Sequence, residues 1–144
     1  MNDLQIVQLA QYRLQQAKET LKEAEILADE QHWRGSINRS YYAMFYAILA
    51  LTIVKGFSTS KHAGVLAFFD REYIKPGILP KSLSKQLHLA FERRQAQDYG
   101  EFIVVDDVIA QETFSSAVEF VDTIDTYLSG SVLPGLQASG SSTL

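Results

Sequence analysis

The sequence predicts an all-α protein, built as an antiparallel bundle of four longer helices plus one short helix. Apolar residues recur at spacings of three and four along most of the chain, which is the periodicity of a helix face. The strict alternation typical of half-buried strands is scarce. Only three prolines occur among 144 residues, so two long stretches can stay helical, and a hydrophobic content of 47% is enough for one core.

The first helix is expected over residues 3–30. Its apolar stripe consists of Leu4, Val7, Leu14, Ala17, Leu21, Ala24 and Leu27. The helix should end near residues 31–33. Gly35 and Ser36 then predict a turn and the start of a new helix.

The second helix, residues 36–54, is apolar on nearly every side and is therefore predicted to be the buried central element. It falls short of the roughly 20 apolar residues that a membrane span needs, and Asn38 and Arg39 shorten the apolar run further, so no membrane contact is expected. Its aromatic side chains could form a platform for stacked bases. They are spread around the whole helix, however, which favours packing in the core.

Three shorter predictions complete the bundle. The hydroxyl residues 58–60 are candidate caps for a third, short helix that runs to about residue 73. Prolines and a glycine near residues 76–80 break the chain, and Ser82 starts a fourth helix that ends between residues 97 and 100. The fifth helix begins at positions 106 and 107, where two aspartates favour the positive end of the helix dipole.

The end of the chain has a different composition. From Ser129 it is uncharged and rich in Ser and Gly, as in a flexible linker or a frayed end. We therefore expect residues 1–128 to form the bundle and residues 129–144 to form a flexible C-terminal tail.

Composition and charge exclude several classes of function. Cysteine is absent, which excludes disulfides, thiolate zinc sites and a cysteine nucleophile and fits a cytoplasmic protein. The net charge of −4 disfavours a protein that coats phosphate backbones, so any nucleic-acid contact should be local, brief or helped by a partner. The histidines at 32, 62 and 88 lack metal-ligand spacing, and no cofactor motif occurs, so neither a metal nor a cofactor is expected.

A polar cluster closes the predicted fourth helix in the stretch FERRQAQDYGEF, residues 91–102. Arg93 or Arg94 could hold a phosphate with two parallel hydrogen bonds, or both could simply be solvated cations at a helix end. Asp98 could take part in a site, pair with an arginine or cap the following turn. Tyr99 could be a site residue or a partly buried aromatic residue with its hydroxyl in water.

Two further groups are candidate binding residues. Arg39 lies in a largely apolar helix and must reach solvent, a dimer mate or a buried acid, because an unpaired buried charge is costly. Our hypothesis is a pair with Asp98 or with an acidic residue of the fifth helix such as Asp107. Lys61 and His62 stand at a predicted helix start, where His62 could act as a cap or a surface residue, or both could line a cleft near Arg94.

Three stretches together resemble the HEPN family (higher eukaryotes and prokaryotes nucleotide-binding domain). They are INRSYYAMFYAILAL at 37–51, STSKHAGVLAFF at 58–69 and the FERRQAQDYGEF stretch, and the resemblance spans about residues 4–128. More narrowly, the chain resembles a small prokaryotic branch with an Asn-Arg-x-Tyr-Tyr-Ala run and an Arg-x-x-x-Asp-Tyr ending. The run is matched by Asn38, Arg39, Tyr41, Tyr42 and Ala43, and the ending by Arg94, Asp98 and Tyr99.

The resemblance implies a helical domain that commonly forms homodimers and is often encoded beside a minimal nucleotidyltransferase as a toxin–antitoxin pair. It also implies a sharper role for Tyr99, as an acceptor of AMP from that partner. Many members of the family are metal-independent RNA endonucleases that carry Arg, four to six residues and then His. In this sequence no histidine follows Arg93 or Arg94 within that window.

The missing histidine matters because RNA cleavage without a metal needs a base for the 2′-hydroxyl and an acid for the leaving oxygen. Histidine suits both steps with a pKa near 6.5, whereas aspartate at about 3.9 is a poor base and tyrosine at about 10 a poor acid. Three hypotheses follow. The protein could partner a nucleotidyltransferase and bind nucleotide or RNA phosphate, it could be an endonuclease using Arg94 with Asp98, Tyr99 or His62, or it could be a helical dimerisation protein without a ligand.

Overall fold

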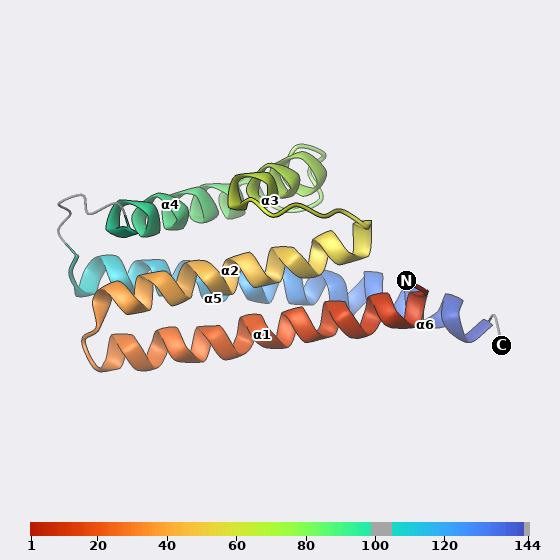
Figure 1. Ribbon diagram of the computed structural model, residues 1–144, viewed down its shortest axis with the longest axis horizontal. Coiled ribbons are helices and arrows are strands. Elements are labelled where there is room, and N and C mark those ends of the chain that lie inside the picture. Colours follow the sequence, from red (N-terminus) through yellow and green to blue (C-terminus); the bar gives the residue numbers. More distant parts are fainter. Residues whose placement is uncertain (99–104, 143–144) are drawn as a thin grey trace.

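The computed structural model describes residues 1–98 and 105–142, and within these residues it is all helical, as predicted. The four longer helices are α1 (Asp3–Asp29), α2 (Trp33–Lys55), α4 (Lys81–Asp98) and α5 (Asp107–Tyr127), and the short helix is α3 (His62–Phe69). Helix α2 packs most extensively against α1 and next against α5. Figure 1 shows α3 and α4 along the opposite side of α2 from α1.

Helix α1 begins at a capping box. The side chain of Asn2 accepts a hydrogen bond from the Gln5 amide at 2.8 Å, and the Asn2 amide donates to Gln5 Oε1 at 3.0 Å. The helix buries Val7, Ala10, Leu14, Ala17, Thr20 and Ala24, close to the predicted stripe, while the predicted Leu4 is exposed. The buried stripe faces α2, which makes the α1–α2 pair the centre of the packing.

Helix α2 begins at Trp33, three residues before the predicted start, so the expected turn at Gly35 and Ser36 is wrong. The chain reverses earlier, at Gln31, whose φ is +62°, and the His32 amide donates to Leu27 O at 2.7 Å. Gly35 and Ser36 instead bring two helices together. A Cβ on Gly35 would lie 3.2 Å from Leu27 Cδ1, and Ser36 Oγ donates to Ala24 O at 2.8 Å.

Helix α2 is by length and composition apolar enough to cross a membrane, but 56% of that stretch is buried inside the protein. Its packing against α1, α5 and α4 gives it the position of a core helix, as the sequence predicts. It ends at Gly56, whose φ of +67° is the left-handed conformation that glycine adopts without strain. The Phe57 amide then donates to Thr52 O at 2.9 Å.

The third helical segment begins later than its predicted caps and ends close to the predicted position. Helix α3 starts at His62, and five residues of π-helix, η1 (Asp70–Ile74), extend it. Among the expected caps, Thr59 accepts a hydrogen bond from the Lys61 amide at 3.3 Å. The aromatic side chains of α3 and η1, Phe68, Phe69 and Tyr73, are almost completely buried and anchor this segment in the core.

Helices α4 and α5 begin close to their predicted starts. Helix α4 follows directly after Pro80, one residue before the predicted Ser82. Asp106 is the N-cap of α5, and its carboxylate accepts a hydrogen bond from the Ile109 amide at 2.9 Å. The last described residue of α4 is Asp98, within the predicted range for its end.

The C-terminal segment, expected to be flexible, is helical through Ser142. A π-helical segment η2 (Leu128–Val132) continues into α6 (Leu133–Ser142), which packs against α1. Leu128 and Leu133 are buried in the core, and Val132 and Leu136 pack against it. These leucines and the valine recur at helical spacing, so the apolar stripe outweighs the Ser- and Gly-rich composition on which the prediction rested.

Candidate phosphate-binding site

Three segments that are far apart in sequence converge on one cluster of side chains. Helix α2 contributes Arg39, Tyr41, Tyr42 and Phe45, the start of α3 contributes His62, and α4 contributes Arg94. We call these six residues the Arg94 cluster. It joins the Asn-Arg-x-Tyr-Tyr run to the Arg-x-x-x-Asp-Tyr ending across more than fifty residues of chain.

Arg94 lies against the two tyrosines. Its Nη2 donates to the Tyr42 hydroxyl at 3.1 Å, and its Cζ lies 5.3 Å from the centroid of the Tyr42 ring and 5.7 Å from that of Tyr41. Contacts of this length between a guanidinium group and an aromatic ring are attractive and restrict the orientation of the cation. The predicted site residues Arg94 and Tyr42 are therefore in direct contact.

Arg39 lies on the same tyrosine. Its Cζ is 5.0 Å from the centroid of the Tyr42 ring, and its Nε and Nη2 donate to Asn38 Oδ1 at 3.2 and 3.0 Å. Two predicted binding residues, Asn38 and Arg39, thus form one unit. Tyr42 consequently has two guanidinium groups beside it, which concentrates positive charge in a protein whose net charge is −4.

Arg39 approaches a carboxylate other than Asp107, one of its two expected partners. The carboxylate that it approaches is Glu23 of α1, at 4.0 Å between Arg39 Nη1 and Glu23 Oε1, rather than Asp107. The Glu23 side chain is 58% exposed, so this pair is weak. The alternative partner, Asp98, is the last described residue of α4, and its side chain lies outside the described part of the structure.

His62 lies inside this cluster. Its ring stacks on Phe45, with 4.3 Å between centroids and 16° between planes, and its Nδ1 shares a 2.8 Å hydrogen bond with the Tyr41 hydroxyl. Burial, followed by the nearby Arg94 cation, holds the pKa of His62 below its ordinary value of 6.5. Of the two readings that the sequence left open, the structure gives His62 a place near Arg94 and no side-chain capping bond.

Tyr41 supports the cluster from within the core. Its side chain is fully buried, and burial raises the pKa of its phenol far above the ordinary value of 10.0, so the hydroxyl keeps its proton at neutral pH. Tyr41 and Phe45 are the two members of the cluster that the sequence did not single out as site residues. They lie four residues apart on one face of α2, but the aromatic residues of this helix indicated core packing.

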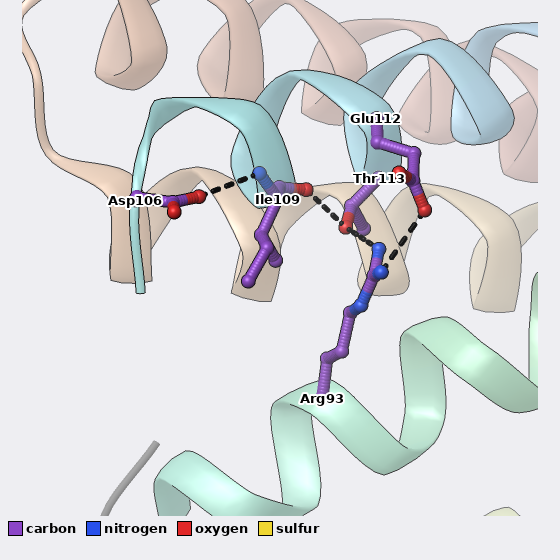
Figure 2. Close-up of polar contacts among 5 residues, drawn as sticks. All are labelled: Arg93, Asp106, Ile109, Glu112 and Thr113. Atoms are coloured by element: carbon purple, nitrogen blue, oxygen red, sulfur yellow. Dashed lines mark hydrogen bonds and ion pairs between the residues drawn. The ribbon is translucent and has the colours of Figure 1, made fainter. Parts of the chain in front are cut away.

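Arg93 contacts helix α5, and Figure 2 shows its guanidinium group directed at Glu112 and Thr113. Its Nη1 donates to Thr113 Oγ1 at 2.8 Å, and its Nη2 forms an ion pair with Glu112 Oε1 at 3.0 Å. Thr113 in turn donates to Ile109 O at 2.7 Å. The structure therefore assigns Arg93 to the contact between α4 and α5 and does not bring this predicted binding residue to Arg94.

The remaining predicted residues are placed only in part. Lys61 is exposed directly before His62, and Tyr99 lies outside the described residues. His88 accompanies Ser84 in a separate cluster, in which both side chains contact the carboxylate of Asp70 at 2.7 Å. Within residues 1–98 and 105–142, no group of three or more His, Asp or Glu side chains is arranged to hold a metal ion.

Comparison with known proteins matches this chain to one domain family and to several relatives. The HEPN domain model matches residues 10–127. A UPF0332 protein of Thermotoga maritima is 38% identical over 117 residues, which are 81% of this chain and 89% of that protein. A Methanocaldococcus jannaschii protein named "Putative toxin MJ0142" is 30% identical over 123 residues, which cover 85% of this chain and 84% of that protein. A second protein of that organism, "Putative toxin MJ0605", is 29% identical over 108 residues, or 75% and 80% of the two chains.

Proposed function

The chain belongs to the HEPN domain family, and on that premise we propose that it is a toxin-like protein that binds the phosphate of an RNA or a nucleotide through the Arg94 cluster. Two relatives whose names read "Putative toxin" support the toxin-like role. The observation that carries the phosphate proposal is the approach of Arg39 and Arg94 to the same tyrosine ring.

The chemistry of the cluster suits a phosphate better than a neutral ligand. A guanidinium group presents its donors in a planar fork that fits two phosphate oxygens, and two such groups can share the charge of one phosphodiester. The half-buried rings of Tyr42 and Phe45 lie beside them, and aromatic faces accept stacked bases without sequence preference. The negative charge of the whole protein would then restrict binding to this one place.

Binding can be measured by fluorescence anisotropy of a labelled single-stranded RNA at low salt, with Arg94→Gln and Arg93→Gln as a matched pair. We expect Arg94→Gln to weaken binding by about tenfold or more, because a hydrogen-bonded ion pair to phosphate is lost. Arg93→Gln should change the affinity by less than about twofold, since Arg93 is engaged on α5. Equal losses in the two variants, with both proteins folded, would refute the proposed site.

We further propose that the protein forms a homodimer and partners a minimal nucleotidyltransferase that transfers AMP to Tyr99. The support is the family membership together with three rings on α2, Tyr42, Phe45 and Tyr46, that remain only partly buried in the single chain. Sedimentation at micromolar concentration tests the dimer, and a monomer would contradict it. Co-purification with the nucleotidyltransferase, followed by intact-mass measurement of wild type and Tyr99→Phe, tests the transfer.

A second function, metal-independent RNA cleavage, is favoured by one observation. The motif histidine is missing after Arg94, but His62 from α3 lies beside the same arginine with a lowered pKa, so its ring is neutral at neutral pH. With Nδ1–H donating to the Tyr41 oxygen, His62 Nε2 can accept the proton of a 2′-hydroxyl. The 2′-oxygen then attacks the adjacent phosphorus, and the bond to the 5′-oxygen breaks as that oxygen takes a proton from water.

Incubation of RNA with purified protein in EDTA tests this second function. Cleavage should be lost in His62→Gln and kept in His88→Gln, because His88 contacts Asp70 in a separate cluster. Because the reacting form of His62 is the neutral one, the rate should be independent of pH above its lowered pKa and should fall below it. RNA that stays intact at every pH would contradict the cleavage function and leave phosphate binding as the proposed function.

A further inference from the structure

A cavity separate from the Arg94 cluster lies where α1, the end of α2 and the start of α3 meet. Its volume is about 340 Å³, and none of its lining residues belongs to the Arg94 cluster. Its walls include Leu9 of α1, Leu49 and Ile53 of α2, Phe57 and Val65. We call it the Arg13 pocket, because the one residue of its lining with a charged side chain is Arg13.

Arg13 has little within the described residues to balance its charge. Its Nη1 donates to the neutral Gln16 Oε1 at 2.9 Å, and its Cζ lies 5.9 Å from the centroid of the Tyr12 ring. Its Nε is buried and has no hydrogen-bond partner in residues 1–98 and 105–142, and no carboxylate there forms an ion pair with it. The Nε is too enclosed to meet a ligand, so an anion in the pocket would pair with the terminal Nη groups of Arg13 and balance the charge that no described carboxylate opposes.

The pocket is held open by contacts that do not depend on a ligand. The Phe57 ring stacks on Phe68 with 4.7 Å between centroids, and the Arg71 guanidinium lies 5.6 Å from the Phe57 ring. On the rim, Thr59 packs closely on Gly64, where a Cβ would come within 2.8 Å of Thr59 Oγ1. A cavity whose walls are already fixed loses little conformational freedom when it is filled.

We infer that the Arg13 pocket binds a small amphipathic anion, in which a carboxylate pairs with Arg13 and a short apolar body packs on the walls. A planar carboxylate matches the fork of a guanidinium group, and the exposed Ser58 hydroxyl on the rim can donate to it. The volume admits roughly ten non-hydrogen atoms at ~30 Å³ each, the share of one water in the liquid. Octanoate has this size and chemistry, and octanamide is its neutral counterpart.

The test titrates octanoate and octanamide separately into isotopically labelled protein and follows the backbone amides by NMR. For the wild type we expect shifts confined to the pocket, in residues 56–59 and around Leu9 and Arg13, with octanoate binding at least about tenfold more tightly than octanamide. Arg13→Gln should remove the difference between the two ligands. The control Arg34→Gln, at an exposed arginine beyond the pocket, should keep it.

Three results would overturn the inference. Equal binding of octanoate and octanamide to the wild type would show an apolar pocket without anion recognition. An unchanged preference in Arg13→Gln would remove Arg13 from the site, and shifts centred on Tyr42 and Phe45 would place the ligand in the Arg94 cluster. The comparison of the two ligands on the wild type keeps the test decisive even if Arg13→Gln fails to fold.

Discussion

Arg93 and Arg94 are adjacent in sequence, yet they connect α4 to two different regions. Successive residues of a helix are separated by about 100° of rotation, so Arg93 reaches α5 while Arg94 reaches α2. On the α5 side the cation contacts a carboxylate and a hydroxyl that is itself hydrogen-bonded, as expected of a structural contact. On the α2 side the cation lies on aromatic rings beside a second arginine, which is the arrangement that suits recognition of a phosphate.

The largest effect on stability is expected on the α2 side, at Tyr41, which is the buried support of the Arg94 cluster. Tyr41→Ala should lower the free energy of unfolding by about 3–5 kcal/mol, because it removes a fully buried ring and leaves a cavity. Tyr42→Ala should cost distinctly less, since Tyr42 is only partly buried. Urea unfolding followed by circular dichroism measures both, and equal losses would mean that the two tyrosines support the fold in the same way.

A smaller effect is expected on the α5 side. Arg93→Gln should lower the free energy of unfolding by about 1 kcal/mol, mainly through the lost bond to Thr113, because the Glu112 side chain is 56% exposed and its ion pair is screened by water. A double-mutant cycle with Thr113→Val isolates this pair. A coupling energy near zero would show that the contact in Figure 2 does not contribute to stability.

The smallest effect is expected in the pH dependence of stability, and it concerns His62 in the Arg94 cluster. His62 has its ordinary pKa in the unfolded chain and a lower one in the fold, so the unfolded chain binds more protons between the two values. This contribution to stability is complete above about pH 6.5 and is lost as the pH falls through the lowered value. His62→Gln should flatten that part of the stability profile between about pH 7 and pH 5, whereas an unchanged profile would contradict the environment assigned to His62.

Much of the fold could be predicted from sequence because it depends on local periodicity. The apolar stripe of α1 and the capping aspartate of α5 are local signals, and both are found in the structure. The start of α2 could not be predicted, since the role of Gly35 depends on Leu27 of the preceding helix. The helical tail was missed because composition outweighed the spacing of its few apolar residues.

The candidate site could be predicted only in part, for a related reason. Motif matching placed Arg94 and Tyr42 in one site, and the structure brings them into contact. The sequence left His62 open between a cap or surface role and a place near Arg94, because it lies 32 residues before Arg94 and meets it only through the packing of α3. The motif match singles out Arg94, but no local signal shows that Arg93 turns to α5, because that depends on which helices face each side of α4.

The packing of α6 on α1 has a practical consequence for handling the protein. The start of α1 and helix α6 lie together at one end of the bundle, and the end of α4 lies at the other (Figure 1). A dye or surface anchor attached at either terminus would therefore stand remote from the arginines that close α4. Single-molecule or immobilised assays of ligand capture can then use either terminus without blocking access to the Arg94 cluster.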